Sequence, residues 1–301
     1  MLPANPSIVA GRRKSASGSK EPRAMFMNLS VGMLGHKATY EETAALAAEH
    51  GFEGIDADLG YAREKGVSAV RELLARHHLK LGSFGLGVRW RPKDSDRDYA
   101  DSLEQLVRDA RMASELGVTR CATWVMPCDD LLSFHQYFEL FVRRMKPVAE
   151  ILDSFDIRLG LEFIGPLTLR APKKHFFVHT MDGMRAVCAA IGVGNCGFLL
   201  DSFHWYTSGG QVADIEHLDS TEVVTVHAND AKAGRTAAEQ IDNQRELPGT
   251  GVIDLKGFFG ALRKIGYDGP VTVEPFNQAL KEMSREDAIK AAAAALKNAM
   301  G

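Results

Sequence analysis

Four polar residues follow apolar runs in the second half of the chain, which has 301 residues. They are Glu162 in GLEFIGP, Asp201 in LLDSFHW, His227 in VTVHAND and Glu274 in VTVEPFN. Singly, a carboxylate at a strand end is usually solvated or caps a helix, and a lone histidine usually packs in the core. A charge that ends a buried strand is costly to desolvate unless it has a partner. Four such residues at equivalent positions indicate one shared site.

The chemistry of these four side chains favours a metal ion. Three carboxylates that point into one pocket repel each other, and their pKa values rise unless a cation lies among them. Two glutamates, one aspartate and one histidine offer mostly oxygen ligands and a single nitrogen. This set suits Mn²⁺ or Mg²⁺ best, with Co²⁺ and Zn²⁺ as alternatives, and disfavours a soft metal. We therefore predict one divalent metal ion bound by Glu162, Asp201, His227 and Glu274.

The elements that must position these residues form one repeating pattern after Met25. Apolar, strand-like segments are predicted at 25–32, 52–60, 81–88, 118–127, 158–166, 196–205, 222–231 and 269–277. Amphipathic helices are predicted at 39–51, 67–78, 98–117, 133–154, 180–191, 211–218, 253–265 and 285–299. Eight strand–helix units favour an α/β fold with a single closed (β/α)₈ TIM barrel over an open sheet. In such a barrel the carboxyl ends of the strands converge on one pocket.

The first 24 residues differ from the rest of the chain. They are polar, basic and rich in Ser, Gly and Pro, with no apolar pattern to bury. Arg12 and Arg13 lack the apolar segment that an export signal requires. We predict a disordered leader at 1–24 and a barrel domain at 25–301.

Composition excludes several classes of function. The formal net charge of −3 does not favour electrostatic binding to nucleic acid. No apolar run approaches the roughly 18 residues that span a bilayer, so no membrane partner is expected. The four cysteines show no CxxC spacing, which favours a reducing, cytoplasmic location. The sequence has neither a GxGxxG motif after the first strand nor a P-loop motif, which argues against a nucleotide-binding fold. The sequence leaves homo-oligomerisation open.

The series of strand ends resembles a known family. The order Glu, Asp-x-x-His, His and Glu, with PGTGVID (248–254) between the last two strands, is similar to the xylose-isomerase-like TIM barrels. These are isomerases and epimerases of sugars and sugar phosphates. The resemblance covers roughly residues 25–300. It implies that the four residues named above bind one divalent metal ion.

The resemblance also implies an activity, a metal-dependent isomerase or epimerase of a small sugar or polyol. Removing a proton next to a carbonyl gives an enediolate, which a metal ion stabilises as a Lewis acid. Glu162 and Glu274 would be the catalytic residues, flanking the substrate and trading a proton. His204 would contact a substrate oxygen, or else support Asp201.

Other substrate-binding residues are expected around the same pocket. Trp124, at the end of the fourth strand, would form an apolar wall against a sugar or pack in the core. The long loop 232–251 carries Arg235 and Arg245. Ketose epimerases of the family have a substrate-binding arginine shortly after the seventh-strand histidine, and Arg235 lies two residues beyond that position. These enzymes also carry a second glutamate where this chain has Thr168.

Two other activities fit the same family. A lyase acting on a keto-sugar, an inosose or a 3-keto-glycoside would begin with the same proton removal. A phosphodiesterase resembling the endonuclease IV branch would need a cluster of several zinc ions and more histidines. Trp124 stands where that branch would place a histidine, so the phosphodiesterase is the weaker alternative.

Overall fold

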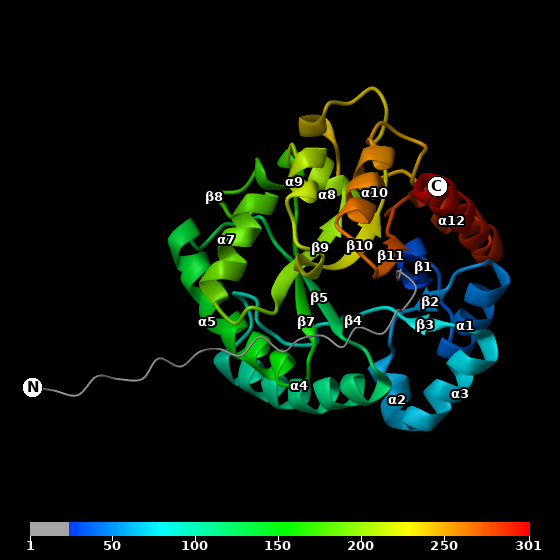
Figure 1. Ribbon diagram of the computed structural model, residues 1–301. Helices are drawn as coiled ribbons and strands as arrows, with labels where there is room; N and C mark the ends of the chain where they lie inside the picture. Colours follow the sequence, from blue (N-terminus) through cyan, green and yellow to red (C-terminus); the bar gives the residue numbers. More distant parts are fainter. Residues whose placement is uncertain (1–23) are drawn as a thin grey trace, which may run out of the picture.

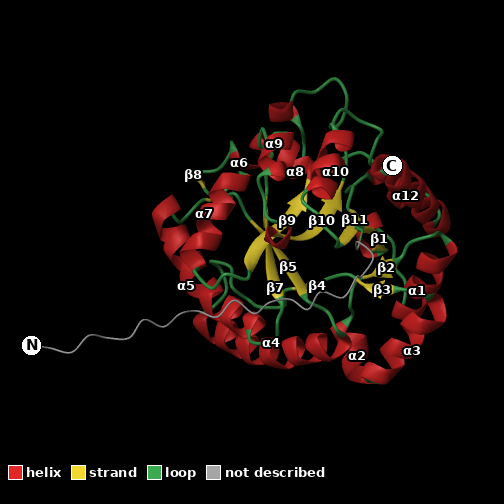
Figure 2. Cartoon of the chain, viewed as in Figure 1, coloured by secondary structure: helices red, strands yellow, loops and turns green. Residues whose placement is uncertain are grey.

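The computed structural model describes residues 24–301. The leader predicted at 1–24 lies outside these residues except for Ala24. A ring of parallel strands occupies the centre of the molecule (Figure 1), and helices surround it (Figure 2). The predicted (β/α)₈ barrel is confirmed.

The nine parallel strands follow the order β3-β2-β1-β11-β10-β9-β7-β5-β4. They are β1 (Phe26–Leu29), β2 (Gly54–Ile55), β3 (Lys80–Leu81), β4 (Phe84–Gly85), β5 (Arg120–Val125), β7 (Arg158–Phe163), β9 (Cys196–Asp201), β10 (Val223–Ala228) and β11 (Pro270–Val273). The two outermost strands, β3 and β4, belong to one short segment of chain. The Gly82 N–H donates to the Ile55 carbonyl at 2.9 Å, and the Leu86 N–H donates to the Ala122 carbonyl at 2.9 Å. This segment therefore pairs on both sides and closes the barrel.

Eight helices match the predicted helices to within a few residues at each end. They are α1 (Tyr40–Glu49), α3 (Val67–His77), α4 (Asp96–Leu116), α5 (Phe134–Asp153), α7 (Met181–Ile191), α9 (Val212–Glu216), α10 (Leu255–Lys264) and α12 (Arg285–Met300). Their starts follow capping chemistry in the sequence. Thr39 and Glu42 form a capping box at α1, and Ser133 and Gln136 form another at α5.

Several short elements that were not predicted lie in the connections between the strands and the main helices. They are α2 (Leu59–Lys65), α6 (Leu167–Arg170), α8 (Ser202–Thr207), α11 (Gln278–Glu282), η1 (Gly32–Leu34), η2 (Ser220–Glu222), η3 (Ala237–Glu239) and the antiparallel pair β6 (Cys128–Asp129) and β8 (His175–Phe176).

All eight predicted strand segments extend beyond the observed strands, and in two of them a capping aspartate starts a helix inside the predicted segment. The segment 196–205 leaves the sheet after Asp201, whose side chain accepts the N–H groups of Phe203 and His204 and starts α8. The segment 52–60 contains only a two-residue strand, and Asp58 accepts the Tyr61 N–H and starts α2 before the predicted segment ends. Aspartate at an N-cap satisfies helix donors that would otherwise be unpaired.

The central strands are buried on both faces, as the consecutive apolar positions predicted. All six residues of β10 are buried, and so are five of the six residues of both β7 and β9. Polar residues at the ends of these strands must therefore find partners inside the protein. The carboxyl end of the barrel is therefore the expected position of a functional site.

Candidate metal centre

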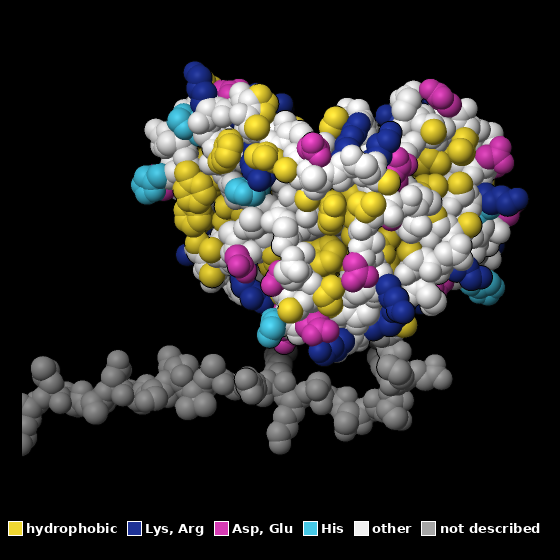
Figure 3. Space-filling view, turned by 90° about the horizontal axis from the view of Figure 1, so that it is seen from above, with side chains coloured by type: hydrophobic (Ala, Val, Ile, Leu, Met, Phe, Trp, Pro, Cys, Tyr) yellow, Lys and Arg dark blue, Asp and Glu magenta, His cyan; other side chains and the backbone are white. Residues whose placement is uncertain are grey.

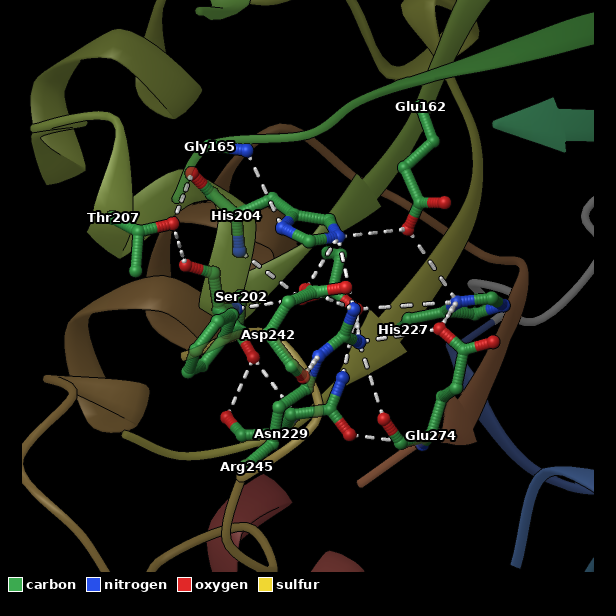
Figure 4. A network of polar contacts seen from close by, with 12 residues as sticks. Glu162, Gly165, Ser202, His204, Thr207, His227, Asn229, Asp242, Arg245 and Glu274 are labelled. Atoms are coloured by element: carbon green, nitrogen blue, oxygen red, sulfur yellow. Dashed lines mark hydrogen bonds and ion pairs between the residues drawn. The ribbon is translucent and has the colours of Figure 1, made fainter. Parts of the chain in front are cut away.

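The four predicted ligands come from four neighbouring strands. Glu162 lies in β7, Asp201 ends β9, His227 lies in β10, and Glu274 follows β11. The strand register pairs His227 with Asp201. One ligand atom from each of the four lies within 4.8 Å of all the others. Figure 4 shows three of the four, Glu162, His227 and Glu274, pointing toward one another.

The imidazole of His227 lies among the three carboxylates. Its Nδ1 is 3.2 Å from Glu274 Oε2, 3.7 Å from Glu162 Oε1 and 4.0 Å from Asp201 Oδ2. Glu162, Asp201 and His227 are buried, and Glu274 is partly buried. Within residues 24–301 this is the only cluster of three or more metal-ligating side chains with such spacing.

The residues fit a divalent cation. Glu162 Oε1 is buried and has no hydrogen-bond partner among residues 24–301. A buried carboxylate oxygen without a donor is unfavourable unless a cation satisfies it. Three carboxylates and one imidazole form the hard, oxygen-rich set that divalent ions such as Mn²⁺ and Mg²⁺ prefer.

The charges in this cluster are unevenly compensated. Burial raises the pKa of Glu162, and the nearby Glu274 carboxylate raises it further. Burial also raises the pKa of Asp201. For Glu274, burial acts in the same direction, but His227 and Arg245 outweigh it and lower the pKa. The carboxylates raise the pKa of His227 to about 9 despite its burial. Additional positive charge is thus needed most beside Glu162.

Arg245 lies at the centre of the network (Figure 4). Its guanidinium group is 3.0 Å from Asp201 Oδ2, 3.2 Å from Glu274 Oε2 and 2.9 Å from Asp242 Oδ1. The side chain is buried, and it stacks near the ring of Phe276 at 4.6 Å. All five N–H donors of this arginine have acceptors within the protein, so it holds two ligand carboxylates in position.

His204 contacts Arg245 rather than the cavity. Its ring is fully buried, and Arg245 Nη2 donates to His204 Nε2 at 3.0 Å. Because arginine can only donate, Nε2 accepts and the proton of the neutral ring lies on Nδ1. The 3.4 Å contact from the Gly165 N–H to Nδ1 is then not a hydrogen bond. Burial, followed by the charge of Arg245, holds the pKa of His204 well below its usual value.

A cavity of about 330 Å³ opens beside the cluster. Its lining includes Trp124, Glu162, Arg245, Glu274 and Phe276. A space-filling view from the side of α9 and α10 shows that one edge of the molecule is hollowed, with basic side chains beside the notch (Figure 3). Two predicted substrate-binding residues, Trp124 and Arg245, thus share a cavity with two predicted metal ligands.

Arg235 lies away from this cavity. Its guanidinium group donates to Gln244 Oε1 at 2.8 Å in an exposed part of the loop. The two arginines of the loop therefore differ in placement. Arg245 lies four residues before Gly249 of the PGTG turn, and this turn brings it inward.

Asn229 supports the cluster and was not predicted from the sequence. Its Nδ2 donates to Asp201 Oδ2 at 2.7 Å, and its Oδ1 accepts the Glu274 N–H at 2.9 Å. The segment HAND (227–230) contained a signal for Asn229, because a side chain two positions after His227 points to the same side of an extended chain.

A second unpredicted residue, Asp230, explains the PGTGVID motif. Its carboxylate accepts four backbone N–H groups, from Ala231, Gly249, Gly251 and Ile253. A side chain at Gly251 would place its Cβ 2.1 Å from the Ala231 carbonyl oxygen, so only glycine fits. The backbones of Asp230 and Glu246 also pair, at 2.8 and 2.9 Å. These bonds fix the segment that carries Arg245 against the end of β10.

The family can now be assigned. Residues 44–299 match the family model described as xylose isomerase-like TIM barrel. The chain belongs to this family.

Curated relatives point to enzymes. The chain is 21% identical over 252 residues to an inosose isomerase of Bacillus velezensis, covering 82% of this chain and 87% of the relative. It is 33% identical over 88 residues to a 3-dehydroshikimate dehydratase of Pseudomonas aeruginosa, covering 29% of this chain and 14% of the relative. These similarities support an enzyme of the isomerase or dehydratase type that acts on a small molecule.

Solved structures share the fold. A xylose isomerase domain protein from Alicyclobacillus acidocaldarius is 29% identical, with a TM-score of 0.83, and the match covers 92% of this chain and 98% of that one. The IOLI protein with a bound zinc atom is 20% identical, with a TM-score of 0.75, over 92% and 98% of the two chains. Among residues 24–301 no helix is long and apolar enough to cross a membrane.

Proposed function

We propose that this protein is a divalent-metal-dependent isomerase or epimerase of a small sugar or polyol ketone. It removes a proton from the carbon next to the carbonyl group and returns a proton to form the product. The observation that carries the proposal is the buried cluster of Glu162, Asp201, His227 and Glu274, with one ligand atom of each within 4.8 Å of the others.

The four residues of the cluster would hold the ion. Glu162 Oε1, which has no other partner among residues 24–301, supplies one ligand atom. When bound, a divalent ion supplies positive charge that stabilises the anion formed by proton removal. Mn²⁺ and Mg²⁺ suit the oxygen-rich set best.

Glu162 and Glu274 are the proposed proton-transfer groups. They line the same cavity but come from β7 and β11, which are separated in the sheet by β9 and β10. Two carboxylates that reach one cavity from different strands can serve two faces of a substrate carbon. One removes the proton and the other returns it.

Arg245 and Trp124 are the proposed substrate-binding residues. Arg245 lines the cavity beside Glu274, and a substrate oxygen would replace one of the acceptors that its N–H groups have within the protein. Trp124 is 41% exposed, and its ring offers an apolar surface to a sugar ring. His204 would act through Arg245, because its Nε2 accepts from that residue.

A lyase is the second candidate. Its support is the identity shared with the 3-dehydroshikimate dehydratase. Elimination begins with the same proton removal, after which a β-substituent leaves and no proton is returned to the carbon. The same ion and the same base would serve both reactions.

Solvent-deuterium exchange tests the proposal. The Mn²⁺-loaded protein is incubated in D₂O with a panel of neutral ketoses, inososes and 3-keto-glycosides, and each product is analysed by NMR. We expect deuterium next to the carbonyl of at least one compound, lost on chelation and restored by Mn²⁺. Exchange with interconversion supports an isomerase or epimerase, and an unsaturated product supports the lyase. Exchange that persists after complete metal removal would refute the metal-dependent mechanism.

A further inference from the structure

A cation beside the cavity has no role in the chemistry described above. Arg91 lies in the turn between β4 and α4, and its guanidinium carbon is 4.3 Å from the ring centre of Trp124. It also lies 5.1 Å from the ring centre of Trp90. Within residues 24–301 no carboxylate oxygen lies within 4.0 Å of this guanidinium group, and no side-chain hydrogen bond satisfies it.

The turn that carries Arg91 is rigidly built. The buried Arg144 donates to the carbonyls of Trp90 at 3.2 Å, Arg91 at 2.8 Å and Asp94 at 3.0 Å. The Arg91 N–H donates to Asp94 Oδ2 at 2.9 Å. The backbone is therefore fixed by bonds that leave the Arg91 side chain free. A fixed turn with a free cation is a feature suited to binding rather than to holding the fold.

The neighbouring Arg89 shows the difference. Its guanidinium group lies 3.7 Å from an oxygen of Asp94 and 3.5 Å from one of Asp98, so its charge is compensated. Arg91 is only partly exposed, yet it has aromatic neighbours and no carboxylate. A guanidinium group has five N–H donors, and stacking on a ring uses none of them.

Arg91 is next to the candidate active site. The strand register pairs Trp124 with Glu162, and parallel strands lie about 4.8 Å apart. Trp124 and Glu162 both line the cavity of about 330 Å³. Trp124 therefore has Glu162 beside it on the next strand and Arg91 over its ring. A substrate that reaches Glu162 and packs on Trp124 would extend toward Arg91, whose guanidinium group lies over that ring.

We propose that the substrate carries a negatively charged group, a carboxylate or a phosphate, and that Arg91 binds it at the edge of Trp124. This inference rests on the proposed function, because it assigns the substrate class of the same site. The planar guanidinium group matches the paired oxygens of a carboxylate or phosphate, and such charge-assisted bonds are stronger than neutral ones. Neutral sugars would bind without this contribution.

Binding measurements test the proposal without relying on turnover. The Mg²⁺-loaded protein is titrated with glucose, glucuronate and glucose 6-phosphate, and tryptophan fluorescence is followed. These three probes share a sugar and differ in charge, and the two anions separate carboxylate from phosphate recognition. We expect at least one anion to bind at least about tenfold more tightly than glucose. Tighter binding of glucuronate alone assigns a carboxylate, and of glucose 6-phosphate alone a phosphate.

Variants assign the effect to Arg91. Arg91→Met should weaken binding of the preferred anion at least about tenfold and leave glucose unchanged, and Arg91→Lys should retain part of the preference. Arg89→Met is the matched control and should stay within about twofold of the wild type. Equal binding of all three probes, no binding of either anion, or an anion preference that survives in Arg91→Met would overturn the proposal.

The proposal and the underlying function fail in different ways. If Arg91 has no such role while neutral ketones still exchange deuterium, the metal-dependent activity stands and the anionic substrate is excluded. If neither the neutral panel nor ketoses that carry a carboxylate or a phosphate exchange deuterium, but Arg91→Met abolishes the anion preference, the anion site stands and the proposed reaction fails.

Discussion

The carboxylates in the two halves of the barrel mouth differ in how many hydrogen-bond donors surround them. At the ends of β7, β9, β10 and β11, three carboxylates surround His227, and Glu162 Oε1 has no donor within residues 24–301. Beside β1, β2 and β3, the partly buried Asp56 instead has several donors. Its Oδ1 accepts from Asn28 Nδ2 at 3.1 Å, from the Ser83 N–H at 2.9 Å and from Ser83 Oγ at 3.1 Å.

The difference shows what a metal site requires beyond acidic residues. A carboxylate that accepts several hydrogen bonds is stable in the interior without a cation. A group of buried carboxylates that shares too few donors is unstable in the interior unless a cation binds to it. Burial raises the pKa of both Asp56 and Glu162, but only Glu162 has a second carboxylate raising it further. The demand for an ion is therefore confined to one half of the mouth.

The largest expected effect is on turnover, from Glu274→Gln in the cluster. Glutamine keeps a carbonyl oxygen for the ion but cannot accept a proton. Turnover of a substrate identified by deuterium exchange should fall by a factor of at least about 100, while the fold is retained. Glu282→Gln, at an exposed position of α11, is the control and should be unchanged. Normal turnover in Glu274→Gln would remove Glu274 from the mechanism.

A large effect on stability is expected from Asp230→Asn. This carboxylate accepts two N–H groups on each oxygen, so an amide NH₂ would face two donors. We expect a loss of about 3 kcal/mol in the free energy of unfolding in urea. Asp254→Asn is the matched control, because asparagine caps a helix as well as aspartate does. Equal stability of the two variants would mean that the Asp230 bonds do not hold the PGTG turn.

The smallest effect is expected from Asp56→Asn in the other half of the mouth. Asparagine Oδ1 can accept the same three hydrogen bonds, so metal content should be unchanged and stability should change by less than about 1 kcal/mol. Loss of the ion in this variant would mean that Asp56 also contributes to the metal site, which would contradict the difference between the two halves of the mouth.

The same variant should also change the pH dependence of stability. Because burial raises the pKa of Asp56 in the folded protein, its contribution to stability is fully present below the ordinary aspartate pKa of about 4. That contribution is lost as the pH rises through the higher folded pKa. The unfolding free energy of Asp56→Asn should therefore fall less than that of the wild type over this range.

The sequence predicted the fold well because the barrel repeats one simple pattern. Apolar strands and capped helices recur eight times, and local signals such as Thr39 with Glu42 mark the helix starts. The break between β3 and β4 and the short helix α8 were missed. These depend on pairing across the barrel and on the double use of Asp201 as predicted ligand and helix cap.

The site was partly predictable for the same reason. Strand ends place Glu162, Asp201, His227 and Glu274 together in any barrel of this order. Sequence distance from His227 could not separate Arg235 from Arg245, because the loop turns back through the bonds of Asp230. Arg91 was missed because it lies far from Glu162 in sequence and approaches it only through Trp124.

Metal content tests the central claim most directly. The purified protein is dialysed against Mn²⁺, freed of excess ion, and its metals are quantified beside Asp201→Asn, His227→Ala and Asp56→Asn. The cluster predicts about one divalent ion per chain in the wild type and in Asp56→Asn, with little in the other two variants. Loss of the ion should follow chelation and be reversed by Mn²⁺. A wild-type chain that binds no ion, or one whose ion survives in both Asp201→Asn and His227→Ala, would contradict the assignment of the metal centre.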